Sequence, residues 1–382
     1  METRMLIFLS CLFAVGFLFV GGCVILSQPR FGKLPGEERF DLINQSPQYK
    51  DGNFQNPQQT PLFSTDDSTL SVLWSGLFTR KERLVPEAPL PAMKTDLRAL
   101  DPRQNIVVWL GHSSWFIQLD GKRIVIDPIL SDYAAPFPFM NRAFAGTSVY
   151  TPEDMPEIDA LLISHDHWDH LDYPTVKALR PKVKQVICPL GVGAYFEHWG
   201  FPTKMISEED WGDTVEIGKD FTVHLLPARH YSGRLFTKNK TLWAGFALVT
   251  SHRRIFFSGD SGHGPHFSDI GQAFNGFDLV LLDCGQYDPR WSYIHMTPEE
   301  AVTAAQDLGA KTLIPAHIGR FTIANHPWDE PFQRLTVASE STSFRLVIPQ
   351  IGEPVALDNP SSQSPEWWST GEFVQKVAQV AY

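Results

Sequence analysis

One stretch of sequence restricts this chain more than any other: LLISHDHWDHLD, at residues 161–172. Its apolar beginning predicts a short buried strand, after which the polarity changes abruptly. The six positions from 165 to 170 hold three histidines and two aspartates. Imidazole and carboxylate are ligands that suit zinc and similar divalent metals. Because the chain has only 13 histidines in 382 residues, we favour a metal site over a polar loop that is His-rich by chance.

Three further candidate ligands follow apolar, strand-like runs later in the chain. His230 follows the run at 221–226, Asp260 the run at 254–257, and His317 the run at 313–316. Residues that follow different strands of a sheet can meet at one edge of the fold. Seven such groups suffice for two ions. We predict that His165, His167 and His230 hold the first ion and that Asp169, His170 and His317 hold the second, with Asp260 as a bridge.

Two neighbouring cations would give such a site a defined chemistry. They can share one water, lower its pKa towards neutrality and clamp the oxygens of an in-line displacement. The result is a hydroxide nucleophile at neutral pH. This chemistry suits hydrolysis of an ester, a lactone, an amide or a phosphodiester. A protein in which the metals only stabilise the fold is the non-catalytic alternative.

The HxHxDH run, with a later His, Asp and His each placed after a strand, resembles the metallo-β-lactamase superfamily. The resemblance implies an α/β fold of the αββα sandwich type. In such a sandwich two sheets pack face to face, helices cover the outside, and the metals lie at one edge. All seven ligand positions of the family pattern are occupied in this chain.

Further motifs resemble a narrower branch, the N-acylphosphatidylethanolamine-hydrolysing phospholipase D enzymes. They are WLGH at 109–112, IDP at 126–128, YDPRW at 287–291, PEEAV at 298–302 and IPAH at 314–317. This resemblance implies hydrolysis of a phospholipid substrate to N-acylethanolamine and phosphatidic acid through a metal-bridging hydroxide. It also implies two zinc ions per chain, with iron or manganese as substitutes, and a homodimer. Hydrolysis of lactones or other small esters is the alternative function.

Several other residues are candidates for roles around such a centre. By resemblance, Asp169 and His295 are the candidate catalytic residues. His295 would contact the substrate phosphate or assist the leaving group, and a purely structural histidine is the alternative. Asp127 and Asp283 end apolar runs, so we expect them to orient ligand histidines. His112 follows a strand in the same way and is a candidate for the same role.

The remaining polar and aromatic residues near the motifs are less informative. His263 and His266 lie outside the ligand pattern and are expected to be loop histidines. A phosphate clamp can come from Arg229, Arg234 and Arg290, since guanidinium suits bidentate phosphate contacts, although surface salt bridges are the default role. The aromatic loop at 133–144 either admits acyl chains or contacts a bilayer, or its side chains pack in the core under a lid.

The N-terminal segment 1–26 predicts attachment to a membrane. Residues 5–26 are almost wholly apolar and uncharged, about the length that spans a bilayer. Two interpretations stay open. One is an uncleaved transmembrane anchor, and the other is a secretory signal that ends before a lipidated Cys23, as in a bacterial lipoprotein. Both place the protein at a membrane, in a bacterial cell envelope.

The rest of the chain divides into three parts. Residues 27–95 are rich in Pro, Gln, Asn and Asp and predict an extended arm with a short helix at 68–80. Residues 96–350 form the expected hydrolase domain, and 351–382 a C-terminal tail. The formal charge of −11 argues against a nucleic-acid partner, because binding phosphate backbones requires a basic surface. Cys188 and Cys284 end apolar runs and are expected to be buried free thiols.

Overall fold

The computed structural model describes residues 22–65, 82–235, 237–358 and 366–369. Its strands are β1 (Tyr49–Lys50), β2 (Asn53–Phe54), β3 (Ile106–Gly111), β4 (Ser114–Leu119), β5 (Lys122–Ile126), β6 (Ala160–Leu162), β7 (Val186–Pro189), β8 (Ile206–Glu209), β9 (Thr214–Gly218), β10 (Phe221–Leu226), β11 (Gly245–Thr250), β12 (Arg254–Phe257), β13 (Leu279–Asp283), β14 (Thr312–Ala316), β15 (Arg345–Leu346) and β16 (Pro354–Ala356). The α-helices are α2 (Glu37–Ile43), α4 (Tyr173–Leu179), α5 (Gly193–His198), α6 (His266–Phe274), α7 (Pro298–Asp307) and α8 (Glu330–Ser339). Short 3₁₀ helices cover Pro29–Phe31, Pro152–Asp154, Arg180–Lys182, Thr203–Met205 and Pro289–Trp291.

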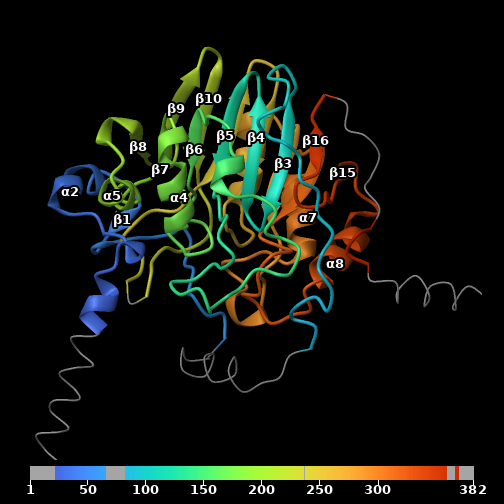
Figure 1. Ribbon diagram of the computed structural model, residues 1–382, viewed down its shortest axis with the longest axis horizontal. Helices are drawn as coiled ribbons and strands as arrows, with labels where there is room; N and C mark the ends of the chain where they lie inside the picture. The colour runs from blue at the N-terminus through green and yellow to red at the C-terminus, as the bar shows by residue number, and fades with distance from the viewer. Residues whose placement is uncertain (1–21, 66–81, 236, 359–365, 370–382) are drawn as a thin grey trace, which may run out of the picture.

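Two seven-stranded sheets form the centre of the molecule (Figure 1). The first has the strand order β16-β3-β4-β5-β6-β7-β8, and the second has the order β15-β14-β13-β12-β11-β10-β9. Both sheets are mixed. Hairpins of antiparallel strands, such as β4–β5, adjoin strands that run parallel, such as β5–β6 and β13–β14. The β4–β5 hairpin turns at Asp120-Gly121.

The alternation of side chains along the strands explains the four layers. In β3, Val107 and Trp109 belong to the apolar cluster between the sheets, whereas Val108 and Leu110 belong to a second cluster that includes residues of α4 and α5. Successive side chains of a strand point to opposite faces, so a strand that is apolar throughout is covered on both sides. On the other side, α6, α7 and α8 contribute to the cluster that holds the second sheet. The sandwich with helices outside is thus the arrangement expected from the sequence.

The directions of the strands bring many carboxyl ends to the same edge. β3 and β5 run alike because each is antiparallel to β4, and β6 is parallel to β5. In the second sheet β10 and β12 run alike because each is antiparallel to β11, and β12, β13 and β14 are parallel. The loops that follow these strands therefore gather below the sheets in Figure 1.

Residues 27–65 of the N-terminal arm pack against the main body of the protein. β1 and β2 pair with each other, and Phe54 is fully buried in a small cluster with Ile43, Leu242 and Trp243. The predicted helix at 68–80 lies outside the described residues, as does most of the apolar segment 5–26. Within the described ranges, no helix combines the length and apolar character needed to cross a bilayer. Cys23 is exposed, and Cys188 and Cys284 are buried free thiols.

The first sheet continues past residue 350, where the C-terminal tail was expected to begin. β16 pairs antiparallel with β3, from Pro354 opposite Val108 to Ala356 opposite Ile106. Further on, the ring of Trp368 stacks on that of Phe332 in α8 at 5.5 Å between centroids. The last described residues are therefore packed on the hydrolase domain.

Arg320 ties the end of β3 to the loop after β5. Its buried guanidinium donates to the carbonyl oxygens of Leu110 at 3.1 Å, Ile129 at 2.6 Å and Ser131 at 3.1 Å. Burial lowers the pKa of Arg320 to about 10, so the side chain stays charged at neutral pH. A neutral replacement would leave these backbone acceptors buried without a donor.

We therefore expect Arg320→Leu to lower the free energy of unfolding by about 3 kcal/mol, because unsatisfied buried carbonyls each carry a desolvation cost. Urea unfolding followed by circular dichroism measures the change. Arg103→Leu, at an exposed arginine that pairs with the nearby Asp101, should leave the midpoint near that of the parent. Equal midpoints for the two variants would contradict the assigned role of Arg320.

Candidate metal centre

All seven predicted ligands meet at the edge where the strand ends gather. The segment 165–170 follows β6, His230 follows β10, Asp260 follows β12 and His317 follows β14. Their ligand atoms fall into overlapping groups in which all atoms lie within 4.8 Å of one another. The structure thus brings together residues that are up to 152 positions apart, from His165 to His317.

The first group contains His165, His167, His230 and Asp260. The Nδ1 atom of His167 lies 2.8 Å from Nε2 of His165 and 3.3 Å from Nε2 of His230. Oδ2 of Asp260 lies 3.7 Å from Nε2 of both His165 and His230. Three imidazole nitrogens and one carboxylate oxygen therefore converge, which is the donor set of a tetrahedral cation site.

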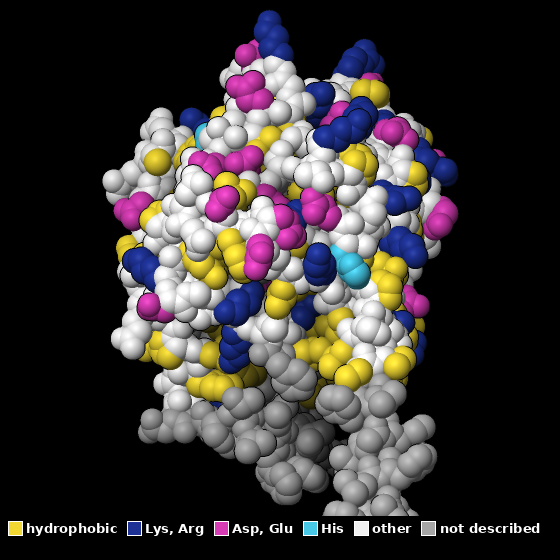
Figure 2. Space-filling model, turned by 90° about the vertical axis from the view of Figure 1, so that its left-hand side faces the viewer, with side chains coloured by type: hydrophobic (Ala, Val, Ile, Leu, Met, Phe, Trp, Pro, Cys, Tyr) yellow, Lys and Arg dark blue, Asp and Glu magenta, His cyan; other side chains and the backbone are white. Residues whose placement is uncertain are grey.

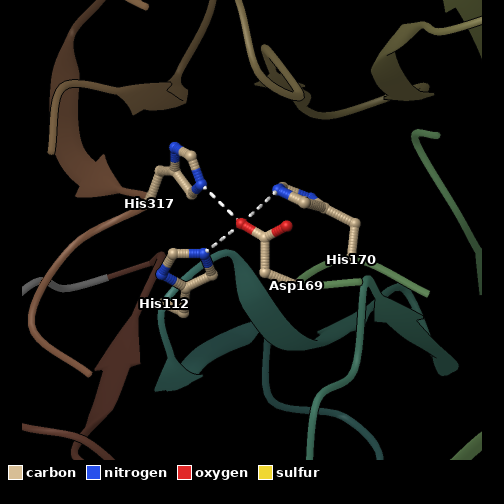
Figure 3. Close-up of side chains that lie close together, drawn as sticks. All are labelled: His112, Asp169, His170 and His317. Atoms are coloured by element: carbon tan, nitrogen blue, oxygen red, sulfur yellow. Dashed lines mark hydrogen bonds and ion pairs between the residues drawn. The ribbon is translucent and has the colours of Figure 1, made fainter. Parts of the chain in front are cut away.

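The second group contains His112, Asp169, His170 and His317, and Asp260 reaches two of these histidines as well. Oδ2 of Asp260 lies 3.1 Å from Nε2 of His170 and 3.4 Å from Nε2 of His317. Oδ2 of Asp169 lies 3.0 Å from Nε2 of His317 and 3.6 Å from Nε2 of His170 (Figure 3). Asp260 is the carboxylate shared by both groups, the position predicted for a bridging ligand.

The outer nitrogens of the histidines are held by protein groups, which leaves the inner nitrogens for a cation. Nδ1 of His170 lies 2.7 Å from Asp127, and Nδ1 of His317 lies 3.2 Å from Asp283. Nδ1 of His230 donates to the carbonyl of Ile294 at 3.0 Å. Partners of this kind fix the tautomer of a ligand histidine and orient its ring. The orienting roles expected for Asp127 and Asp283 match these contacts.

Four buried atoms at the centre lack any hydrogen-bond partner among the described residues. They are Nδ1 of His112, Nε2 of His167, Nε2 of His170 and Oδ1 of Asp260. Buried polar atoms are normally satisfied, and a divalent cation would satisfy the last two. Imidazole and carboxylate donors together are compatible with zinc, iron or manganese. The residues present therefore fit the metal centre that the sequence predicts.

The two groups differ in their protonation without metal. Burial lowers the pKa of His165 and His230 well below the usual value and that of His167 to about 4. In the second group burial acts in the same direction, but the charges of Asp260 and Asp169 raise the pKa of His170 well above its usual value. Asp260 and Asp283 likewise overcome burial and raise the pKa of His317 to about 10. Without metal, the raised pKa values favour protonated rings for His170 and His317 in the second group.

His295 belongs to a third group of converging ligand atoms, together with Asp260, Asp283 and His317. Its Nδ1 is 2.8 Å from Oδ2 of Asp283. Its ring centroid is 5.0 Å from those of both His230 and His317. His263 and His266 lie outside the ligand groups, as expected. His263 pairs with Asp307, whereas His266 is the first residue of α6, not a loop residue, and contacts Ser261.

The three candidate phosphate arginines are engaged by protein groups. Arg234 is buried, donates to the carbonyls of Asp166 and Leu171, and lies over the ring of Trp168. Arg290 pairs with Asp288 at 2.7 Å, and Arg229 donates to Thr60 in the arm at 3.1 Å. Each of these guanidinium groups already binds other protein groups, which does not favour the predicted phosphate clamp.

Two residues that support the centre were not found from the sequence. The side chain of Asn56 in the arm donates to the carbonyl of His230 at 2.7 Å and accepts from its amide at 3.3 Å. Asp166 accepts from the amide of Gly233 at 2.7 Å and from the hydroxyl of Tyr195 at 2.9 Å. Asp166 stands inside the metal motif and was identifiable as a candidate, whereas nothing in the local sequence marks Asn56.

Comparisons with known proteins agree with this arrangement. Residues 122–318, just over half of the chain, match the family model of the beta-lactamase superfamily domain. Over 331 residues the chain is 38% identical to an uncharacterized protein of Mycobacterium tuberculosis, which covers 86% of this chain and 88% of the relative. The chain belongs to the metallo-β-lactamase superfamily. Its ligand cluster and this membership together make it a metal-dependent hydrolase of the superfamily.

Other members of the metallo-β-lactamase superfamily are similar over parts of the chain. The N-acyl-phosphatidylethanolamine-hydrolyzing phospholipase D 1 of Caenorhabditis elegans is 35% identical over 231 residues, which are 56% of this chain and 63% of that protein. The solved structure of Igni18, a metallo hydrolase from Ignicoccus hospitalis, aligns with a TM-score of 0.51 at 20% identity. That alignment covers 66% of this chain and 97% of Igni18 and concerns the fold alone.

The protonation of the second group predicts that metal uptake releases protons. A pKa of about 10 for His317 means that it is protonated in the metal-free protein at pH 7, and a ligand nitrogen must be deprotonated. Metal affinity should therefore rise as the pH increases towards 10. Calorimetric titration of metal-free protein with zinc, in buffers of different ionisation enthalpy, counts the protons. His317→Gln should release fewer protons than the parent, and a binding enthalpy that is independent of the buffer would contradict the prediction.

Proposed function

We propose that the protein is a phospholipase-D-type phosphodiesterase that hydrolyses N-acylphosphatidylethanolamine-like lipids to N-acylethanolamine and phosphatidic acid. The observation that carries the proposal is an exposed aromatic surface that adjoins the metal centre. Similarity to the phospholipase D of Caenorhabditis elegans supports the same substrate class.

The aromatic surface begins within the metal-binding segment itself and continues outward to solvent. The ring of Trp168 meets that of Phe31 at 5.5 Å, and Phe31 meets Phe137 at 6.2 Å. Phe137 stacks on Phe139 at 5.6 Å. Phe139 is 76% exposed and Met140 44% exposed. Large apolar side chains left in water beside an active centre are typical of a surface that contacts a ligand or a membrane.

Membrane attachment through the N-terminal segment is part of this proposal. The apolar stretch 5–26 ends five residues before Phe31, and Arg30 donates to the carbonyl of Pro136 in the aromatic loop at 2.9 Å. In Figure 2 hydrophobic side chains gather in the lower part of the face shown, Lys and Arg are spread over the whole face, and Asp and Glu lie mostly in its upper half. Apolar groups together with basic side chains suit a phospholipid surface. Attachment would hold the metal centre near lipid headgroups in a bacterial envelope.

The residues of the centre have separable roles in the proposed reaction. Two ions, when bound, would supply a water of lowered pKa and positive charge opposite the phosphoryl oxygens. Asp260 would hold both ions at a fixed separation, and Asp169 would complete the second site. Asp283 holds Nδ1 of His295 at 2.8 Å, which would fix the imidazole ring beside the substrate phosphate or the leaving group. We propose zinc as the metal, with iron or manganese accepted by the same donors, and a homodimer as the assembly.

The direct test is incubation of purified, metal-analysed protein with N-acylphosphatidylethanolamine in mixed micelles. We expect N-acylethanolamine and phosphatidic acid from the parent, and a rate at least about 100-fold lower from Asp260→Asn, because loss of a shared ligand disturbs both sites. Asp307→Asn removes a carboxylate that lies outside both ligand groups and should retain activity. If two metals are present and the lipid is untouched, the lipid substrate is wrong, and lactones and simple esters become the leading candidates.

The aromatic surface gives a second, independent prediction. Phe139→Ser should slow hydrolysis of lipid in vesicles by about tenfold, because it removes a large apolar side chain from the contact with the bilayer. Hydrolysis of a water-soluble phosphodiester by the same variant should match the parent, since Phe139 lies outside the ligand groups. Val337→Ser, at another exposed apolar side chain, on α8, is the matched control. Equal effects on soluble and vesicle substrates would argue against lipid contact by this loop.

A further inference from the structure

One oxygen of Asp169 is surrounded by three imidazoles. Its Oδ2 lies 3.0 Å from Nε2 of His112, 3.0 Å from Nε2 of His317 and 3.6 Å from Nε2 of His170 (Figure 3). His317 and His170 are predicted ligands of the second ion, whereas His112 is not. His112 is fully buried, so its contact with Asp169 takes place away from solvent.

The bonds at the outer ring nitrogens distinguish the three histidines. Nδ1 of His170 and Nδ1 of His317 each contact a carboxylate. When Nε2 of such a ring binds a cation, the proton of the ring stays on Nδ1. Neither ring then has a proton for Asp169. Nδ1 of His112 has no hydrogen-bond partner among the described residues. A proton there would be buried and unpaired, and it would leave two acceptors facing each other at 3.0 Å.

We propose that His112 is a positioning residue for the second ion. It donates Nε2–H to Oδ2 of Asp169 and holds this carboxylate in the orientation that binds the cation. A carboxylate oxygen has two lone pairs, so one serves the ion and the other accepts from His112. The inference rests on the two-ion centre proposed above and adds that the affinity of its second site depends on a side chain that does not touch the metal.

The backbone of His112 is held independently of its side chain. His112 directly follows β3 and has a φ of 55°, in the left-handed region. Its carbonyl accepts from Nε1 of Trp109 at 2.9 Å and from the amide of His317 at 3.2 Å. His112 therefore connects Asp169, from the first sheet, with His317, from the second. Because these backbone bonds survive substitution, side-chain variants at this position retain the local framework.

A matched pair of variants isolates the donated hydrogen bond. His112→Gln and His112→Leu carry the same backbone strain, and only glutamine supplies an N–H that can reach Asp169. Titration of metal-free protein with zinc, in competition with a chromophoric chelator, gives the affinity of each site. We expect the parent and His112→Gln to bind two ions with similar affinities. His112→Leu should keep the first site and bind the second ion about 10- to 100-fold more weakly.

A second variant covers the case in which leucine disturbs folding. His112→Asn tolerates a left-handed backbone and is too short to reach Asp169, so it should behave as His112→Leu is expected to. Thermal unfolding of the metal-free variants verifies that each is folded.

Three results would overturn the inference, and they differ from one another. Parent-like binding of both ions by His112→Leu or His112→Asn would mean that His112 does not position Asp169. An equal loss in His112→Gln and His112→Leu would point to direct ligation by the imidazole. A parent protein that binds a single ion would refute the two-ion centre itself, and the parent titration shows this before any variant is compared.

Discussion

The burial of negative charge is the constraint on which this structure depends. Asp127 and Asp283 are fully buried, Asp260 is 3% exposed, and Asp169 lies between His112 and His317. Carboxylates removed from water are stable only when they are paired or bound to a cation. Imidazoles from both sheets supply the pairing, so the two halves of the sandwich are joined at the centre by charge as well as by their apolar core. The histidines neutralise the negative charge of these carboxylates only in part, and bound cations would neutralise the rest.

The backbone geometry at the strand ends serves the same centre. His112 follows β3 with a φ of 55°, Asp127 follows β5 with 42°, and His317 follows β14 with 61°. Left-handed backbone is unfavourable for residues other than glycine, although Asn, Asp and His tolerate it best. Such strain clusters at functional sites where the surrounding structure maintains it. Each of these three residues directly follows its strand, at the edge of the sheets where the candidate ligands lie.

The parts of this centre that could be predicted from sequence are those with a local pattern. The HxHxDH run and the apolar stretches before His230, Asp260 and His317 were sufficient to predict that these seven side chains meet at one edge, and the resemblance to the superfamily supplied the sandwich. The supports were not predictable, because their partners are distant in sequence. Asn56 holds His230 across 174 residues, and Arg320 reaches Ile129 across 191. Both side chains donate to a backbone carbonyl. Because every residue type has a backbone carbonyl, the partner leaves no pattern in the sequence.

The two ligand groups also differ in which protein groups contact the outer nitrogens of their histidines. His230 is backed by the carbonyl of Ile294, and His165 by the hydroxyl of Ser164. His170 and His317 are backed by the carboxylates of Asp127 and Asp283. Against the effect of burial, Asp260 contributes most to the raised pKa of both histidines, and these backing carboxylates act in the same direction. Metal binding to the second group would therefore displace protons that the first group lacks.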